Sequence, residues 1–261
     1  MSNKKSVIDI GEGAAIPDPD DPGLFTAWRI SFFGTLAIMA YLLLAKPDPY
    51  LDIIKYLPDG ILITFKVTFA SISLALVLGL IAGLGRISKN KLFNLAASTY
   101  IEVVRGIPLL VQLFYIYFAL GHLVRVPDMV AAIIAMGFCY GAYMGEVFRA
   151  GINSIDDGQT EASLSLGFNR AQTMRYVVLP QAWRTILPPV GNEFIALLKD
   201  TSLVSILAVS DILRRGREFA SESFLYFETY TMVALVYLLI TLILSKLLSN
   251  MENRLNHYER R

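Results

Sequence analysis

The residues best placed for a specific interaction lie in a polar stretch between two apolar segments. It runs from Asp157 to Gly167 and is followed by an aliphatic-x-Leu-Pro sequence that ends at Pro180. A short amphipathic helix that enters a partner's groove needs small and apolar contacts, plus a charge that fixes its register. We interpret Glu161 as such a charge and not as a catalytic base; an ordinary solvated loop helix is the alternative. The residues assigned to this docking contact are Gly158, Glu161, Ala162, Ser163, Leu164, Gly167, Leu179 and Pro180.

The local sequence predicts how this polar stretch folds. Asp156 and Asp157 can cap a helix, because a short carboxylate accepts hydrogen bonds from the free amides of the first turn. The helix is expected over residues 160–166, and Gly167 can take the left-handed conformation that ends it. A second helix is expected over residues 170–178, and Pro180 should stop it. The prediction is a corner of two short helices that can be pushed as a rigid lever.

Ionisable side chains inside apolar segments form a second group of candidates. Such groups are costly in a bilayer and are functional candidates by default. Lys199 and Asp200 are adjacent, so on a helix they point about 100° apart and do not face each other. The helix that carries them either lines an aqueous path through the membrane or makes a structural ion pair with Glu102, Arg105 or another chain. The residues assigned to a path or gate are Glu102, Arg105, Asn192, Glu193, Lys199, Asp200, Thr201 and Ser202.

Two carboxylate–guanidinium pairs are predicted from their spacing. Glu102 and Arg105 are three residues apart and can pair on one helix face. Gly106 and Pro108 then disturb the helix, which suits either a gate or a simple helix boundary. Glu146 and Arg149 have the same spacing and are expected to form an interfacial pair.

The composition sets the fold class that must position these residues. Of the 261 residues, 55% are hydrophobic, which is typical of an all-α polytopic membrane protein. A bilayer core of about 30 Å requires about 20 apolar residues in a helix. Six segments are predicted to span the membrane: residues 26–45, 60–85, 106–120 with a helical lead-in from residue 92, 129–147, 187–209 and 230–248. The fifth carries several charges and would fail a strict hydropathy rule.

Glycines four residues apart mark close helix contacts within these segments. They form grooves that let helix backbones approach each other. The contact is either packing inside one chain, which we favour, or a subunit interface. The residues concerned are Gly79 and Gly83 in the second segment, and Gly137, Gly141 and Gly145 in the fourth.

Charge and cysteine content exclude several classes of function. A net charge of +1 gives no nucleic-acid footprint. Cys139 is the only cysteine, so no intrachain disulfide forms, and the isolated His122 and His257 do not predict a metal site. Most Lys and Arg residues fall on one side when six spans alternate, which predicts that both termini and the Glu161 loop are cytoplasmic.

Together with its flanks, the polar loop resembles the signature loop of the permeases of ABC importers, in the polar amino acid branch. The loop motif is Glu161-Ala162-Ser163, three residues, Gly167, and then Leu179-Pro180. Three further stretches resemble that branch: residues 100–110, 141–152 and 187–203. The family usually has Ala where this chain has Ser163. The resemblance covers about residues 57–250, and the first span is extra to the usual five-span core.

The resemblance implies an inner-membrane permease subunit that imports polar amino acids by alternating access. Its partners would be a cytoplasmic ATPase dimer, a second identical or related permease, an extracytoplasmic solute-binding protein and membrane lipids. The sequence has no Gly-x4-Gly-Lys-Ser/Thr phosphate loop, so ATP and magnesium belong to the ATPase and this chain needs no cofactor of its own. The alternatives are a permease for an opine or amine, and a gradient-driven secondary transporter.

The resemblance also divides the chain into regions. Residues 1–25 are expected to form a flexible cytoplasmic tail, because residues 16–23 are rich in Pro and Asp and cannot form a helix. Residues 26–49 are the extra N-terminal span. Residues 50–250 are the permease domain, with the coupling loop at 153–182, and residues 251–261 are a second cytoplasmic tail.

Overall fold

The fold is a bundle of helices. The computed structural model describes residues 26–119 and 126–256, and within these residues all regular secondary structure is helical. The predictions for residues 1–25, for the end of the third segment and for residues 257–261 lie outside the described residues. The first residues of the expected C-terminal tail are helical and form the end of the last helix, α11 (Tyr226–Asn256).

Four helical stretches are long and apolar enough to cross a bilayer, and a bent pair brings the number to five if it counts as one span. The prediction of six spans is therefore not confirmed for the described residues. The four stretches are α1 (Ala27–Ala45), α2 with α3 (Pro47–Tyr56 and Pro58–Arg86), α6 (Asp128–Asn153) and α11. The bent pair is α4 (Lys91–Gly106) with α5 (Leu109–Phe114) and η1 (Tyr115–Ala119).

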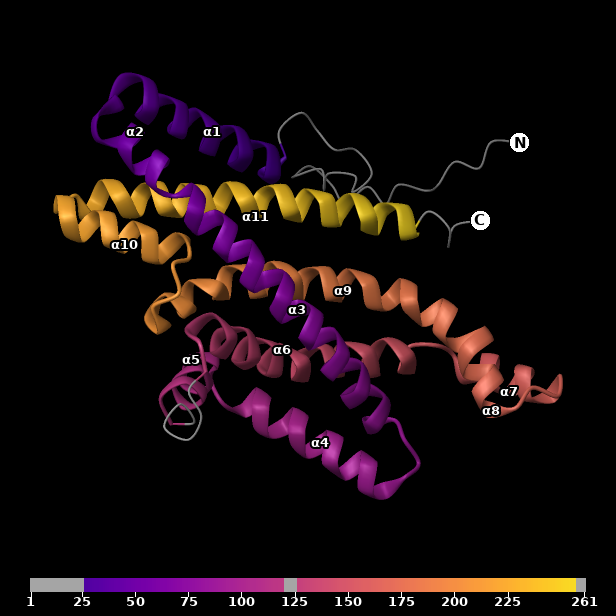
Figure 1. The fold of residues 1–261 in the computed structure, drawn as a ribbon. Coiled ribbons are helices and arrows are strands. Elements are labelled where there is room, and N and C mark those ends of the chain that lie inside the picture. Colours follow the sequence, from indigo (N-terminus) through magenta and orange to yellow (C-terminus); the bar gives the residue numbers. More distant parts are fainter. Residues whose placement is uncertain (1–25, 120–125, 257–261) are drawn as a thin grey trace, which may run out of the picture.

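The segment predicted as the fifth span is the charged helix α9 (Leu179–Asp200). It is not among the helices apolar enough to cross a bilayer. A 3-10 helix, η4 (Thr201–Leu207), continues it, and Ala208 in a left-handed conformation (φ 63°) ends that stretch. α9 lies against α6 and α11 (Figure 1).

Helices α3 and α6 pack against each other more extensively than any other pair of helices described in the bundle. A Cβ added at Gly79 would lie 2.3 Å from the Cβ of Met144, and one added at Gly83 would lie 2.8 Å from the carbonyl oxygen of Gly145. A Cβ added at Gly137 would lie 2.6 Å from the side chain of Leu74. These contacts all lie within one chain, so the glycines hold two helices at near backbone contact.

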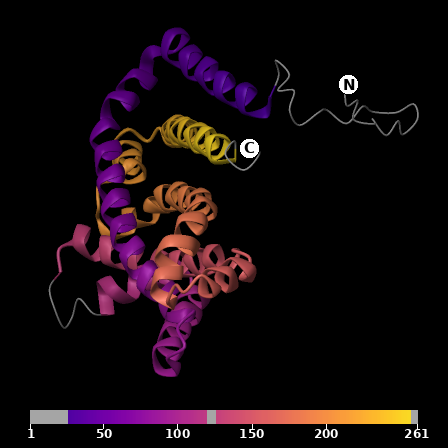
Figure 2. The ribbon, with the colours of Figure 1, turned by 90° about the vertical axis from the view of Figure 1, so that its right-hand side faces the viewer.

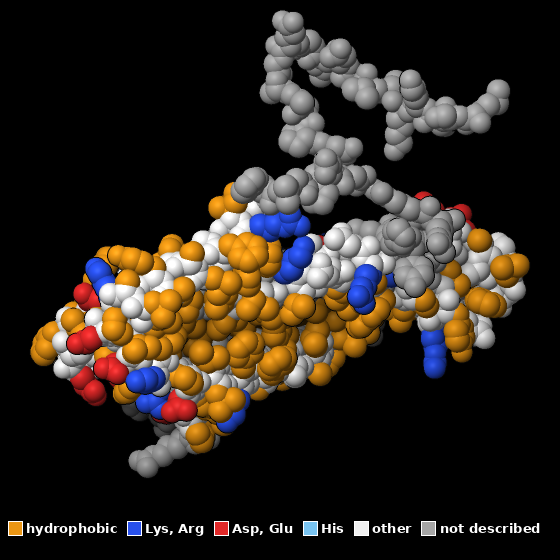
Figure 3. All heavy atoms as spheres, turned by 90° about the horizontal axis from the view of Figure 1, so that it is seen from above, with side chains coloured by type: hydrophobic (Ala, Val, Ile, Leu, Met, Phe, Trp, Pro, Cys, Tyr) orange, Lys and Arg blue, Asp and Glu red, His pale blue; other side chains and the backbone are white. Residues whose placement is uncertain are grey.

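The N-terminal helices wrap around α11. Figure 2 shows α1, α2 and α3 curving past it. The indole nitrogen of Trp28 donates a hydrogen bond to the carbonyl oxygen of Leu242 at 2.9 Å, and the ammonium of Lys246 lies 5.4 Å from the indole ring centre. From above α1 and α11 (Figure 3), the surface is mostly hydrophobic and acidic side chains gather toward its ends. This pattern fits a surface surrounded by lipid.

The amphipathic helix α10 (Ile212–Ser223) lies at the end of the bundle opposite α7 and α8 (Figure 1). The side chain of Asp211 is fully buried and caps α10, accepting from the amides of Leu213 at 3.1 Å and Arg214 at 2.9 Å. The Tyr237 hydroxyl of α11 donates to the same carboxylate at 3.1 Å. Burial raises the pKa of Asp211 to about 6, despite these hydrogen bonds.

Candidate functional site

The predicted corner forms, and its first helix is α7 (Asp157–Ser165). Asp156 is the N-cap, and its carboxylate accepts from the amide of Gly158 at 2.7 Å. Gly167 has φ 87° and ends the helix, because the amides of Gly167 and Phe168 donate back to the carbonyls of Leu164 and Ser163. The predicted cap and C′ positions are therefore confirmed.

The second helix differs from the prediction at its far end. α8 (Arg170–Thr173) begins with a capping box between Asn169 and Gln172, and a π-helical turn, η3 (Met174–Val178), follows it. Pro180 does not stop the helix. It lies in the first turn of α9, where a missing amide costs little, and the wide turn before it carries the chain on, with the amide of Leu179 donating to the carbonyl of Met174. The second helix of the corner is consequently continuous with α9, and α8, η3 and α9 form one helical rod.

Most residues assigned to the docking contact are exposed at this corner. Leu166 is 81% exposed, and Leu164 and Phe168 are also open to solvent. Ser163 is the exception, because it is buried and its hydroxyl lies 2.8 Å from that of Thr173. Its proposed contact with a partner is therefore wrong, since the side chain faces α8. The exposed members of the assigned set are Gly158, Glu161, Ala162, Leu164, Gly167 and Pro180, whereas Leu179 is half-buried.

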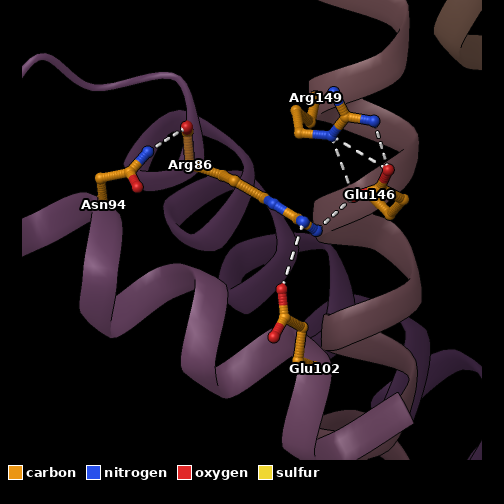
Figure 4. A network of polar contacts seen from close by, with 5 residues as sticks. All are labelled: Arg86, Asn94, Glu102, Glu146 and Arg149. Atoms are coloured by element: carbon orange, nitrogen blue, oxygen red, sulfur yellow. Dashed lines mark hydrogen bonds and ion pairs between the residues drawn. The ribbon is translucent and has the colours of Figure 1, made fainter. Parts of the chain in front are cut away.

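A network of charged side chains lies near the C-terminal end of α6, the end that is predicted to face the cytoplasm (Figure 4). The predicted Glu146–Arg149 pair is confirmed, with the Nε of Arg149 3.0 Å from both carboxylate oxygens. Arg86, at the end of α3, also donates to Glu146 at 2.8 Å and lies 3.6 Å from Glu102 of α4. One guanidinium therefore joins three helices.

The predicted pairing of Glu102 with Arg105 is not what the structure shows. Glu102 instead faces Arg86, while the guanidinium of Arg105 lies over the ring of Tyr143, 5.1 Å from its centre. The reason is that α4 presents the two side chains to different neighbours, α3 and α6. Sequence spacing alone could not distinguish these partners.

Arg105, although exposed, lies beside a polar cluster formed by α6 and α9. The Tyr140 hydroxyl donates to the carboxylate of Asp200 at 2.8 Å, and the rings of Tyr140 and Tyr143 lie 5.9 Å apart. Arg105 and Asp200 both lie close enough to Glu193 to act on its charge. α4, α6 and α9 thus bring one guanidinium and two carboxylates to the same region.

Lys199 points away from this cluster. It is exposed and lines a hollow of about 310 Å³ with Ser202, Tyr237 and Thr241. Asn192, seven residues earlier on α9 and so on the same face of the helix, is also exposed. Thr201 is buried and its hydroxyl donates to the carbonyl of Leu198 at 2.6 Å, so it cannot line an open path. Of the eight residues assigned to a path or gate, Arg105, Glu193 and Asp200 thus lie in or beside the polar cluster, and Asn192, Lys199 and Ser202 lie on a more open side of α9 and η4. Glu102 belongs to the charge network and Thr201 to none of these groups.

Several of the connecting residues were not assigned from the sequence. Arg86 has partners on two other helices, and Glu146 is 60 residues away in the chain, so its spacing to them carries no signal. Tyr140 and Tyr143 are three apart in an apolar helix, which was a usable signal of a polar face. Gln112 stands alone in an apolar run, and its polarity was the only hint. Within the described ranges, no three His, Cys, Asp or Glu side chains are grouped so as to hold a metal ion.

The chain is similar to transport permeases over most of its length. It is 39% identical to the glutamine transport system permease protein GlnP of Escherichia coli over 205 residues, which are 77% of this chain and 94% of the relative. It is 43% identical to the probable amino-acid permease protein YxeN of Bacillus subtilis over 189 residues, covering 70% of this chain and 84% of that protein. The arginine transport system permease protein ArtQ of Bacillus subtilis is 34% identical over 204 residues, which are 77% of this chain and 93% of ArtQ.

Solved structures show the same fold. A crystal structure of an amino acid ABC transporter with histidines has a TM-score of 0.75 and 42% identity, covering 78% of this chain and 97% of that chain. The MetNI methionine ABC transporter in inward-facing conformations has a TM-score of 0.68 at 18% identity, covering 77% of this chain and 97% of that chain, which supports the fold alone. The family described as binding-protein-dependent transport system inner membrane component matches residues 75–257. The chain belongs to this family.

Proposed function

We propose that this chain is the permease of an ATP-driven importer of polar amino acids, coupled to a separate ATPase through α7. The observation that carries the proposal is the continuous rod from α8 through η3 into α9. One end of that rod forms the exposed corner, and the other end carries Glu193, Lys199 and Asp200. Movement at the corner would therefore reach the charged interior directly.

The polar cluster fits an amino acid as substrate. A zwitterion carries a carboxylate and an ammonium, and Arg105 offers a partner for the first while Glu193 and Asp200 offer partners for the second. The two tyrosine rings add hydroxyl and π-face contacts. The names of GlnP and ArtQ, which are glutamine and arginine permeases, support a polar amino acid.

A second permease would complete the path along α9. Trp183, near the corner, is the one large apolar residue exposed on this helix, at 53%. Toward the far end of the helix the exposed residues are Thr185, Pro189, Asn192 and Lys199, none of which is large and apolar. Lys199 is level with Tyr237 and Thr241, near the middle of α11, where an ammonium facing lipid costs about 3 kcal/mol. This side of α9 is therefore better suited to an aqueous path between two permeases than to lipid. In that arrangement α9 is the fifth of six spans.

The remaining partners follow from the two ends of the bundle. The exposed apolar residues of the corner would contact a cytoplasmic ATPase dimer that binds ATP and magnesium. The opposite end, with Arg214, Arg215 and Arg217 on α10, would receive the extracytoplasmic solute-binding protein. Both termini then lie in the cytoplasm of a bacterium whose inner membrane holds the complex.

The decisive experiment reconstitutes the chain in proteoliposomes with its ATPase and binding protein. Uptake of a polar amino acid should require ATP and be lost in E161K. E252K makes the same charge change on the last turns of α11, away from the corner, and should transport normally. Uptake that needs no ATP, or normal uptake by E161K, would overturn the coupling. For the substrate, R105M should raise the apparent KM for uptake, and an unchanged KM would count against the cluster.

A further inference from the structure

The bend between α4 and α5 leaves backbone carbonyls without their helical partners. The two helices meet at an angle of 102° across residues 107 and 108. Pro108 has no amide hydrogen, so it cannot donate to the carbonyl of Val104 as a continuing helix would. That carbonyl keeps only a long bond, 3.4 Å, from the amide of Ile107. Inside a membrane, such freed groups must find partners within the protein.

The carbonyl of Ile107 is freed by the same break. In a continuous helix the amide of Val111 would donate to it, but that amide donates to the carbonyl of Pro108 at 3.0 Å. The amide of Gln112 donates to the same carbonyl at 3.2 Å, as it would in a regular helix. Two neighbouring carbonyls, those of Val104 and Ile107, are therefore available to a side-chain donor.

Gln112 supplies that donor from the first turns of α5. Its Nε2 atom donates to the carbonyl of Val104 at 2.8 Å and to the carbonyl of Ile107 at 2.8 Å. The side chain is 7% exposed, and the sulfur of Cys139 on α6 lies 3.5 Å from the same nitrogen. A primary amide has two hydrogens, so this one side chain satisfies both carbonyls and closes the bend.

The space beside the bend would allow α5 to move. A hollow of about 480 Å³ lies between α4, α5 and α6, and its lining includes Val103, Val111, Tyr115 and Phe138 along with Gln112. Apolar side chains such as Val103 and Val111 pack without directional bonds. The two hydrogen bonds of Gln112 are accordingly the side-chain restraints that tie α5 to the end of α4 at this point.

We propose that Gln112 is the positioning residue that sets the α4–α5 bend, and that release of its two hydrogen bonds lets the bend change during the transport cycle. This inference rests on the proposed function, because α4 also carries Arg105 of the polar cluster. A change of the bend would move Arg105 relative to Asp200 and Glu193 and so open or close that cluster.

Cys139 is a built-in reporter of the closed bend. It is the only cysteine of the chain, it is 2% exposed, and it lies against Gln112. In the purified permease, N-ethylmaleimide labelling of Cys139, read by mass spectrometry, should be at least about tenfold faster in Q112M, which has a similar volume and no donor. Q159M makes the same exchange on the exposed face of α7 and should label at the wild-type rate.

A second variant separates the hydrogen bonds from general damage. P108A supplies a backbone amide to the carbonyl of Val104, so P108A/Q112M should label more slowly than Q112M. Equal rates in these two variants, or a wild-type rate in Q112M, would overturn the proposal. If Q112M alone fails to fold, recovery of folded P108A/Q112M supports the proposal and loss of both variants contradicts it.

The transport cycle supplies the last comparison. In the assembled transporter, wild-type Cys139 should label at different rates without nucleotide and with ATP and vanadate. Equal rates in both states would show that the bend does not move. ATP-driven uptake by the wild type alongside normal labelling of Q112M would overturn this inference and leave the proposed function intact.

Discussion

The buried pair of hydroxyl groups in the corner predicts that one single substitution destabilises the corner more than the double substitution does. Ser163 and Thr173 are 4% and 3% exposed, and their oxygens lie 2.8 Å apart. The Ser163 hydroxyl also lies 2.8 Å from the carbonyl of Thr160. Each serine or threonine hydroxyl has one hydrogen, so Thr173 donates to Ser163 while Ser163 donates to Thr160.

The two single substitutions should therefore differ in cost. S163A leaves the Thr173 hydroxyl buried without its acceptor, which costs about 1–3 kcal/mol. T173V keeps the shape of the side chain and leaves Ser163 bonded to Thr160, so it loses one hydrogen bond, about 1 kcal/mol. The double variant removes both hydroxyls together and should fall closer to the wild type than S163A does, because no polar group is then left unpaired.

The assay is the affinity of the purified permease for its ATPase, together with the thermal unfolding midpoint of each variant. A corner loosened by about 1.4 kcal/mol should bind about tenfold more weakly. S163A should be the weakest, T173V intermediate and S163A/T173V near the wild type. Additive losses in the double variant, or a larger loss in T173V than in S163A, would refute the assigned directions of the hydrogen bonds.

Three further predictions concern other parts of the molecule. Gly167→Val forces a β-branched residue to φ 87°, which should weaken ATPase binding while insertion into the membrane is retained; membrane fractionation and pull-down check this. Burial raises the pKa of Asp211 to about 6, so the folded state binds a proton at this carboxylate more tightly than the unfolded chain does. The free energy of unfolding should therefore rise by up to about 3 kcal/mol as the pH falls from 7 toward 4. D211N should lose this pH dependence, as measured by thermal unfolding. G79L should reduce the yield of folded protein sharply, because a Cβ there lies 2.3 Å from that of Met144, whereas G34L, with nothing within 4 Å, should fold normally.

The sequence predicted the features that depend on neighbouring residues. The cap at Asp156, the left-handed Gly167, the Glu146–Arg149 pair and the break near Pro108 all follow from spacings of a few residues. Such features are decided by local backbone geometry, so one sequence is enough to predict them. The all-helical class followed in the same way from apolar run lengths.

The features that failed depend on how helices are placed in space. Arg86 meets Glu146 across 60 residues of chain, so spacing gave no reason to prefer it as a partner of Glu102 over the closer Arg105. The sequence places Ser163 in the loop but does not give the direction of its side chain, so the predicted contact with a partner fails. Pro180 was read as a stop because a π-helical turn, which carries the chain through, has no simple sequence signal.

The close contact of α3 with α6 also constrains which parts of the molecule can change shape. Gly79 and Gly83 approach the backbone of the opposite helix so closely that sliding would drive their neighbours into collision. We therefore expect α3 and α6 to move as one rigid unit throughout a transport cycle. Conformational change would then occur in the helices packed against this unit, which are the rod that contains α9 and the bent pair α4 and α5.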